Sequence, residues 1–150
     1  MMDFQGKIAL VTGASSGMGA ETARLLSDGG ARVFGAQRGL SDFEDIAVDF
    51  ADPSSPEKAI EHIAKATGQL DILVNNAGVM REGTVEETSL DDWHLQMQIN
   101  LTAPFLLIRY AMPLLRAARG AIVNVGSIVG LGNNPRHPAY GASKAGLHGL

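Results

Sequence analysis

A tyrosine and a lysine stand four positions apart near the end of the sequence, as Tyr140 and Lys144 in Y-G-A-S-K. On a helix, residues at this spacing lie on one face about one turn apart. A free tyrosine is a poor base at neutral pH, but a nearby ammonium group favours its phenolate form. The pair therefore indicates proton transfer by Tyr140 assisted by Lys144, although a lone pair of this kind also occurs on solvated helix faces.

Two further polar residues fit the same chemistry. Ser127 lies thirteen positions before Tyr140, just after an apolar run, where its hydroxyl can hydrogen-bond a substrate oxygen. Asn100 lies in a long helical pattern, four residues before Pro104. Because proline has no N–H, the Asn100 carbonyl lacks its usual helical partner and is left free, unless this is an ordinary proline kink.

A glycine-rich turn, T-G-A-S-S-G-M-G over residues 12–19, follows the first strand-like run and opens a helix. Such a turn lets backbone N–H groups and the helix dipole meet a pyrophosphate. The spacing is neither G-x-G-x-x-G nor that of a phosphate loop ending in lysine. Two alternatives stay open: residues 13–17 also match the G-x-S-x-G turn of serine hydrolases, and a glycine turn can bind nothing.

The elements that must position these residues follow from the alternation of β-type apolar runs and helical segments. Strands are expected at Lys7–Thr12, Arg32–Ala36, Asp45–Phe50, Asp71–Asn75 and Ala121–Val125. Gly39–Glu44 leaves room for a turn but not for a helix. The pattern predicts an α/β fold with a Rossmann-type doubly wound parallel sheet, in a single domain over residues 1–150.

The expected helices have recognisable starts. Hydroxyl caps at Ser54 and Ser89 begin two of them, the first running to about Thr67. The second is long, and i,i+4 spacing places four of its large apolar residues on one stripe. These are Trp93, Met97, Leu101 and Phe105.

Together, T-G-x-x-x-G-x-G, Asn75-Asn76-Ala77-Gly78, Ser127 and Y-x-x-x-K resemble the short-chain dehydrogenase/reductase family. The resemblance implies an oxidoreductase that transfers a hydride between a nicotinamide cofactor and an alcohol or ketone. It implies a catalytic group of Asn100, Ser127, Tyr140 and Lys144. It also implies that the cofactor is bound by Gly13, Ser15, Ser16, Gly17, Met18, Gly19, Arg38, Asp49, Phe50, Asn76, Ala77, Gly78, Tyr140 and Lys144.

In that family, Tyr140 would act as general acid or base, Ser127 would orient the substrate oxygen, and Lys144 would hold the nicotinamide ribose. The free Asn100 carbonyl would bind a water that links the lysine to solvent. The end of the second strand selects NAD or NADP. Gln37 stands where NAD-type members carry an acid, and Arg38 stands where many NADP-type members carry a basic residue. NADP is therefore favoured, with NAD as the alternative.

Composition excludes several other classes. A net charge of −4 gives no attraction to nucleic acid or anionic membranes, and no apolar run approaches the length of a membrane span. The absence of cysteine excludes disulfides and thiolate sites, and the histidines show no metal-binding spacing. We expect a cytoplasmic protein with a small-molecule substrate and no metal, and the family resemblance implies a homodimer or homotetramer.

The chain stops at Leu150, inside the helix that carries Tyr140, whereas family members continue through further strands and helices. We therefore expect a longer native product, and an isolated 150-residue chain that folds poorly because its fifth strand is a bare edge. The alternative function is a non-catalytic dinucleotide-binding or sensor protein of the same fold. The presence of Ser127, Tyr140 and Lys144 argues against that alternative.

Overall fold

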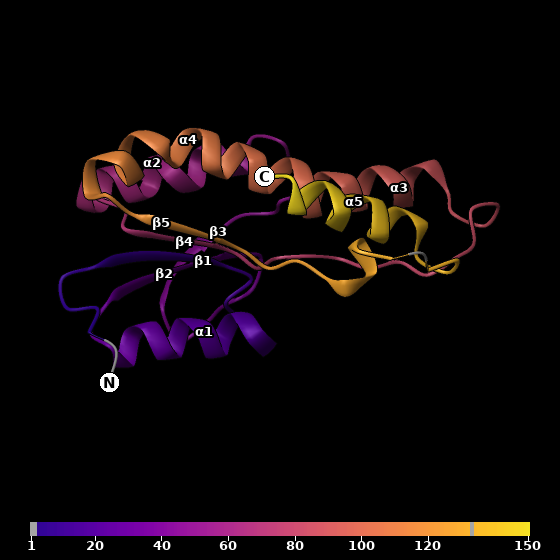
Figure 1. Ribbon diagram of the computed structural model, residues 1–150. Helices are drawn as coiled ribbons and strands as arrows, with labels where there is room; N and C mark the ends of the chain where they lie inside the picture. Colours follow the sequence, from indigo (N-terminus) through magenta and orange to yellow (C-terminus); the bar gives the residue numbers. More distant parts are fainter. Residues whose placement is uncertain (1–2, 133) are drawn as a thin grey trace.

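The computed structural model describes residues 3–132 and 134–150 (Figure 1). These residues form one parallel sheet in the order β3-β2-β1-β4-β5. The strands are β1 (Ile8–Thr12), β2 (Arg32–Gln37), β3 (Glu44–Ala47), β4 (Ile72–Asn75) and β5 (Ala121–Asn124). The chain thus builds outward on one side of β1 and then crosses to the other side, which confirms the Rossmann-type doubly wound sheet.

Helices cover both faces of the sheet (Figure 1). Helix α1 (Gly17–Asp28) lies on one face, and α2 (Ser55–Thr67) and α4 (Ala103–Ala118) lie on the other. Helices α3 (Leu90–Met97) and α5 (Pro138–His148) pack against each other on the α4 side. The link between β2 and β3 contains no helix, as its length predicts.

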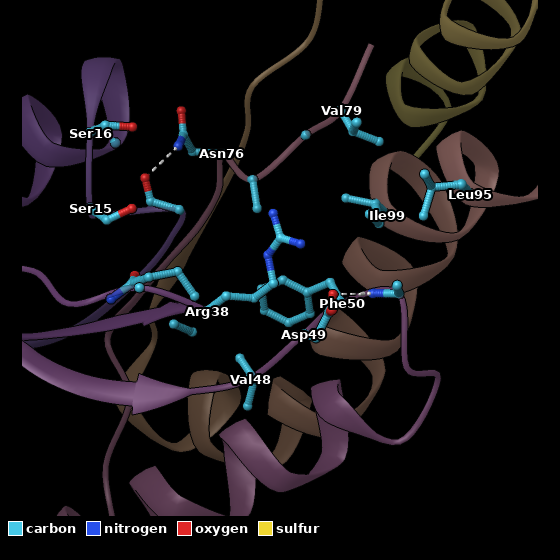
Figure 2. A pocket seen from close by; sticks show the side chains of 18 of the residues that line it. Ser15, Ser16, Arg38, Val48, Asp49, Phe50, Asn76, Val79, Leu95 and Ile99 are labelled. Carbon is cyan, nitrogen blue, oxygen red and sulfur yellow. Dashed lines mark hydrogen bonds between the residues drawn. The ribbon is translucent and has the colours of Figure 1, made fainter. Parts of the chain in front are cut away.

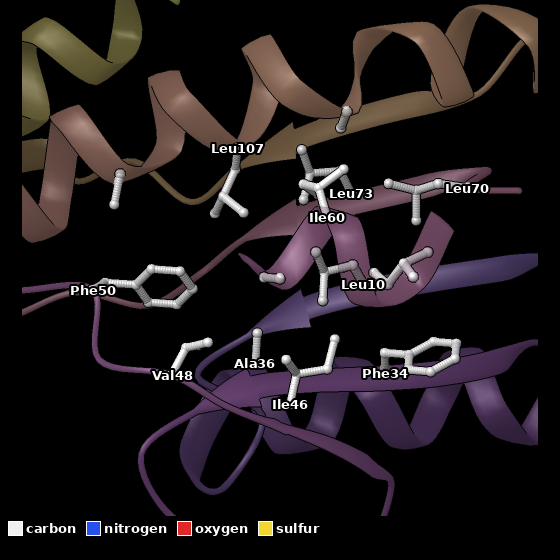
Figure 3. Close-up of a cluster of buried hydrophobic side chains, with 14 of the residues drawn as sticks. Leu10, Phe34, Ala36, Ile46, Val48, Phe50, Ile60, Leu70, Leu73 and Leu107 are labelled. Carbon is white, nitrogen blue, oxygen red and sulfur yellow. The ribbon is translucent and has the colours of Figure 1, made fainter. Parts of the chain in front are cut away.

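Two apolar clusters hold these layers together. The larger lies between the sheet and helices α2 and α4, and Figure 3 shows Leu10, Ile60, Leu73 and Leu107 meeting there. The smaller lies under α1 and includes Ala23. Because β1 is covered on both faces, residues 9–11 are apolar and completely buried without alternation. Packing on both faces holds the strands in place, and the candidate site lies at their carboxyl ends.

The third strand is shorter than the sequence predicts, because it ends at Ala47 rather than Phe50. As an edge strand it pairs only with β2, and the last residue of β2, Gln37, is in register with Ala47. The Val48 N–H still donates to the Gln37 carbonyl at 3.0 Å, and only the residues after it leave the sheet.

Of the two predicted hydroxyl caps, one is confirmed. The Ser89 hydroxyl accepts a hydrogen bond from the backbone N–H of Asp92 at 3.0 Å. The Ser54 hydroxyl makes no capping bond, so that prediction is wrong. It donates instead to the carboxylate of Asp52 at 2.8 Å, since that acceptor lies only two residues away.

The long helix contains a change of pitch that the sequence pattern did not predict. Residues Gln98–Thr102 form a π-helical turn, labelled η1, between α3 and α4. Across this turn the i,i+4 spacing does not hold, and the predicted stripe breaks: Phe105 is exposed. The buried face is formed instead by Gln96, Asn100, Ala103 and Leu107.

Candidate active site

The carboxyl ends of β1 and β4 are tied together by side-chain hydrogen bonds. The Thr12 hydroxyl accepts from the backbone N–H groups of Asn76 at 3.0 Å and Ala77 at 2.9 Å. The Asn76 amide donates in return to the Thr12 carbonyl at 2.9 Å. It also donates to the Gly13 carbonyl at 3.4 Å (Figure 2). The glycine turn and the N-N-A-G segment are therefore neighbours, at the edge where parallel sheets bind ligands.

The glycine turn leaves its backbone open to a ligand. Gly13 has a φ of 70°, a left-handed conformation that favours glycine. A Cβ atom at Gly19 would overlap the Gly13 carbonyl, so α1 can start against the turn only without a side chain there. Ser16 makes no side-chain cap, and the first turn of α1 has no acidic residue. The first N–H groups of α1 thus remain available to an anion.

A cavity of about 510 Å³ opens over these segments (Figure 2). It is lined by most of the predicted cofactor residues: Gly13, Ser15, Ser16, Met18, Gly19, Arg38, Asp49, Phe50, Asn76, Ala77 and Gly78. Gly17, Tyr140 and Lys144 do not line it. The lining also includes residues that the sequence did not single out, among them Val79, Arg81, Leu95 and Ile99. The size, the glycine turn and the uncapped helix start fit a bound dinucleotide.

Gln37, where the family resemblance places a cofactor-selecting residue, is engaged by the protein itself. Its Oε1 accepts from the backbone N–H of Ala14 at 3.1 Å, and its Nε2 donates to an Asp45 oxygen at 2.6 Å. A hydrogen bond from the Ser41 hydroxyl is the largest factor lowering the pKa of Asp45. The ionised Asp45 therefore fixes the Gln37 amide, which is 7% exposed and has a protein partner at both its oxygen and its nitrogen.

Arg38, the next residue, behaves differently. It is exposed, and Figure 2 shows its side chain reaching into the cavity. Within residues 3–132 and 134–150, it forms no hydrogen bond or ion pair. Arg38 is therefore the charged group at the end of β2 that can meet a ligand.

Tyr140 and Lys144 lie together on α5, as their spacing predicts. The Lys144 Nζ stands 5.9 Å from the centre of the Tyr140 ring and donates to the Val125 carbonyl at 2.7 Å. Lys144 is 3% exposed, and burial lowers its pKa. A Cβ atom at Gly78 would stand 3.8 Å from Nζ. The ammonium group therefore lies where α5, the end of β5 and the N-N-A-G segment meet.

Ser127 is held at the start of a short 3₁₀ helix, η2 (Ile128–Gly130). Its hydroxyl accepts from the backbone N–H of Val129 at 3.2 Å. Its own N–H donates to the His148 ring at 3.4 Å, and a Cβ atom at Gly126 would overlap that ring. His148 is one turn after Lys144 on α5, so α5 contacts both the β5 end and the Ser127 turn.

Asn100 sits inside the π-helical turn and is completely buried. Its Oδ1 accepts from the Val79 N–H at 2.8 Å, and its Nδ2 donates to the Val79 carbonyl at 2.8 Å and to the Ser143 hydroxyl at 3.0 Å. The side chain thus connects the segment after β4 to α5. The sequence had suggested a role for the Asn100 carbonyl only, and that role stays a prediction.

Three residues at this edge were missed by sequence reasoning: Gln96, Asp45 and His148. Gln96 is completely buried and binds the Arg81 backbone N–H at 3.0 Å. The available signal was its position four residues before Asn100, which puts two amides on one helix face. Asp45 and His148 gave no usable signal, because the contact of Asp45 with Gln37 depends on strand pairing and the partner of His148 lies on another element.

The residues that the structure describes contain neither a metal-binding cluster nor a membrane-spanning helix. No group of three or more histidine, aspartate or glutamate side chains could hold a metal ion there. Within the same residues, no helix is long and apolar enough to cross a membrane.

Comparison with known proteins agrees with this arrangement. The family model of short chain dehydrogenases matches residues 7–150. The chain belongs to the short-chain dehydrogenase/reductase family. A 3-oxoacyl-acyl-carrier-protein reductase of Salmonella typhimurium is 38% identical over 99% of this chain and 66% of its own length. A D-threitol dehydrogenase of Mycolicibacterium smegmatis is 39% identical over 99% of this chain and 64% of its own.

The fold is shared with a solved family structure. Ligand-free aldohexose dehydrogenase of Thermoplasma acidophilum superposes with a TM-score of 0.92 at 30% identity, covering 98% of this chain and 59% of that one. An oxidoreductase of Thermotoga maritima without an assigned substrate is 39% identical over 99% of this chain and 64% of its own length. The chain thus spans slightly less than two thirds of the length of these relatives.

Proposed function

We propose that the protein is an oxidoreductase that transfers a hydride between NADP(H) and an alcohol or ketone. The observation that carries the proposal is the meeting of Lys144, Asn100 and Gly78 beside a cavity that fits a dinucleotide. Tyr140 lies one turn before Lys144 on the same helix face. The names of the relatives, a reductase and several dehydrogenases, support the same reaction class.

The preference for NADP over NAD rests on the end of β2. NAD-selecting enzymes place an acid there to bind the ribose hydroxyls. Here Gln37 has both amide ends bonded inside the protein, whereas the Arg38 guanidinium is free to form a forked pair with a 2′-phosphate. Asp45, the nearby carboxylate, already accepts hydrogen bonds from Gln37 and Ser41, so it does not replace the acid that accepts from the ribose hydroxyls in NAD-selecting enzymes.

In the proposed reaction, the cofactor, when bound, would accept the hydride in oxidation and donate it in reduction. During oxidation, Tyr140 takes the hydroxyl proton of the alcohol as general base, and Ser127 stabilises the substrate oxygen through its hydroxyl. Lys144 favours the phenolate form of the tyrosine and holds the nicotinamide ribose. Asn100 fixes the segment after β4 and offers its carbonyl to a water on the proton path. In reduction, the same groups act in reverse.

The test is NADPH consumption by the purified protein on a panel of ketones, compared between the wild type and Tyr140→Phe. Removing the hydroxyl removes the acid, so we expect a loss of at least about 100-fold in rate. Tyr110→Phe is the matched control, since Tyr110 lies on α4 and packs against the larger apolar cluster. Equal rates in Tyr140→Phe and the wild type would reject Tyr140 as the acid or base. Binding of NADPH without turnover of any ketone would favour the non-catalytic binding protein.

We also propose a cytoplasmic homodimer or homotetramer that acts on a small molecule. The net charge of −4 supports the absence of nucleic acid as a partner, and the resemblance to the family supports the oligomer. Light scattering of the purified protein tests the second point, and a monomer at all concentrations would contradict it.

A further inference from the structure

Gln96 is a completely buried amide on α3, at a helix position where an apolar side chain is usual. Burying an amide is unfavourable unless its polar atoms are hydrogen-bonded. Here both ends are satisfied by backbone groups. Oε1 accepts from the Arg81 N–H at 3.0 Å, and Nε2 donates to the Asp92 carbonyl at 3.2 Å. The bond to Arg81 is the one that reaches outside the helix.

The backbone that Gln96 binds has no regular structure of its own. Residues 76–84 belong to no helix or strand, and residues 76–79 and 81 of this segment line the cavity directly after β4. Asn100, one turn after Gln96, binds both the N–H and the carbonyl of Val79. Two amides on one helix face therefore hold the backbone at Val79 and Arg81.

Both held residues line the cavity. Arg81 has an exposed guanidinium whose Nε lies 3.8 Å from an Asp92 oxygen. Gln96 is bonded to the backbone of both members of this pair. Its bond to the Arg81 N–H therefore fixes the backbone from which the Arg81 side chain extends toward Asp92.

We propose that Gln96 is a positioning residue which, with Asn100, holds Val79–Arg81 in place along the wall of the cavity. This inference rests on the proposed function, in which that cavity binds NADP(H). A wall that is already ordered does not have to be ordered when the cofactor binds, so less binding energy is lost. Gln96 acts through the backbone of Arg81 and touches no reacting atom.

The test replaces Gln96 with methionine, which has the same length but no hydrogen-bonding group. Loss of one hydrogen bond and the resulting unpaired Arg81 N–H should weaken NADPH binding roughly 5- to 10-fold in a fluorescence titration. Hydrogen exchange of the Arg81 amide should accelerate by a similar factor or more, with or without NADPH. The pH profile of kcat should not move. Gln69→Met is the matched control, since the Gln69 amide binds Asp71 at the opposite end of the sheet.

Gln96→Glu separates positioning from simple loss of packing. Burial raises the pKa of a carboxyl group at such a site. In its protonated form the acid can accept from Arg81 and donate to Asp92, as the glutamine does. We therefore expect NADPH affinity and Arg81 exchange in Gln96→Glu to approach wild-type values at mildly acidic pH and to worsen as the pH rises. This comparison also carries the test if Gln96→Met fails to fold.

Wild-type Arg81 exchange in Gln96→Met, or unchanged NADPH affinity despite faster exchange, would overturn the proposal. So would a Gln96→Glu variant whose affinity does not depend on pH more steeply than that of the wild type. If the wild-type protein itself does not bind NADPH, the proposed function fails. The exchange measurement still decides whether Gln96 holds the Arg81 backbone.

Discussion

Replacing Arg38 with alanine should weaken NADPH binding much more than NADH binding. Arg38 reaches into the cavity and is bonded to no described residue, so no protein group competes for its guanidinium. A hydrogen bond to a charged group contributes roughly 1.5–3 kcal/mol, which corresponds to roughly 10- to 150-fold in affinity. Because Arg38 is exposed, water screens the interaction, and we expect the lower part of this range, about 10- to 30-fold.

The assay is a titration of the purified protein with NADPH and NADH, followed by cofactor fluorescence. NADH lacks the 2′-phosphate, so its affinity should change by less than about 3-fold, the size of an ordinary surface effect. Arg116→Ala, in the last turn of α4, is the control and should change neither affinity. Added salt should weaken NADPH binding to the wild type more than to Arg38→Ala. An equal loss for both cofactors, or none, would refute the assignment of Arg38 to the 2′-phosphate.

Substitutions at three other positions, two of them with a rescuing second change, test the surroundings of the site. Gln37→Asp should lower the melting temperature, because it places a second carboxylate beside Asp45. The double variant Gln37→Asp with Asp45→Asn should recover stability and shift cofactor preference toward NADH. Failure to recover stability would contradict the Gln37–Asp45 contact. Lys144→Met should abolish turnover but not folding. Since burial lowers the Lys144 pKa, the unfolded chain binds the lysine proton more tightly than the folded chain does. The free energy of unfolding of the wild type should therefore rise, relative to that of Lys144→Met, as the pH approaches 10.5. A fall in this difference in stability over the same pH range would contradict the prediction. Gly126→Ala should reduce kcat several-fold because its Cβ overlaps the His148 ring, and His148→Ala should restore it; no rescue would exclude that contact as the cause.

The features that could be predicted from the sequence are those with a local pattern. The strand–turn–helix around Gly13 and the pairing of Tyr140 with Lys144 depend on residues a few positions apart, and the structure has both. The absent helix before β3 followed from chain length alone. The positions of most predicted cofactor residues around one cavity then follow from parallel strands that end at one edge.

The engagement of Gln37 could not be predicted, because it depends on strand register. The β2–β3 pairing puts Asp45 opposite Gly35, on the same side of the sheet as Gln37. Gly35 has no side chain, and a Cβ atom there would lie 3.0 Å from the Gln37 amide. The glutamine therefore folds over Gly35 to reach Asp45. A single sequence does not reveal the β2–β3 register, and without the register it cannot show that Asp45 and Gln37 meet over Gly35.

The predicted apolar stripe on the long helix was wrong for a different reason. The prediction assumed regular i,i+4 spacing along the whole helix. The π-helical turn at Gln98–Thr102 adds a residue and shifts the buried face. Pro104 was a visible sign of an irregularity, although it did not specify its type. The polar residues Gln96 and Asn100 occupy the buried face, so a hydrophobic pattern could not reveal it.

Hydride transfer between NADPH and a carbonyl carbon is the core of the proposed function. Its most direct test is isotope transfer: the purified protein is supplied with a ketone and NADPH carrying deuterium at the reactive ring carbon, on either face, and the alcohol is analysed by mass spectrometry and NMR. We expect one deuterium per NADPH consumed, on the carbinol carbon and from one face only, with none after Tyr140→Phe. An alcohol without deuterium from either labelled face, or NADPH consumed without alcohol, would contradict it.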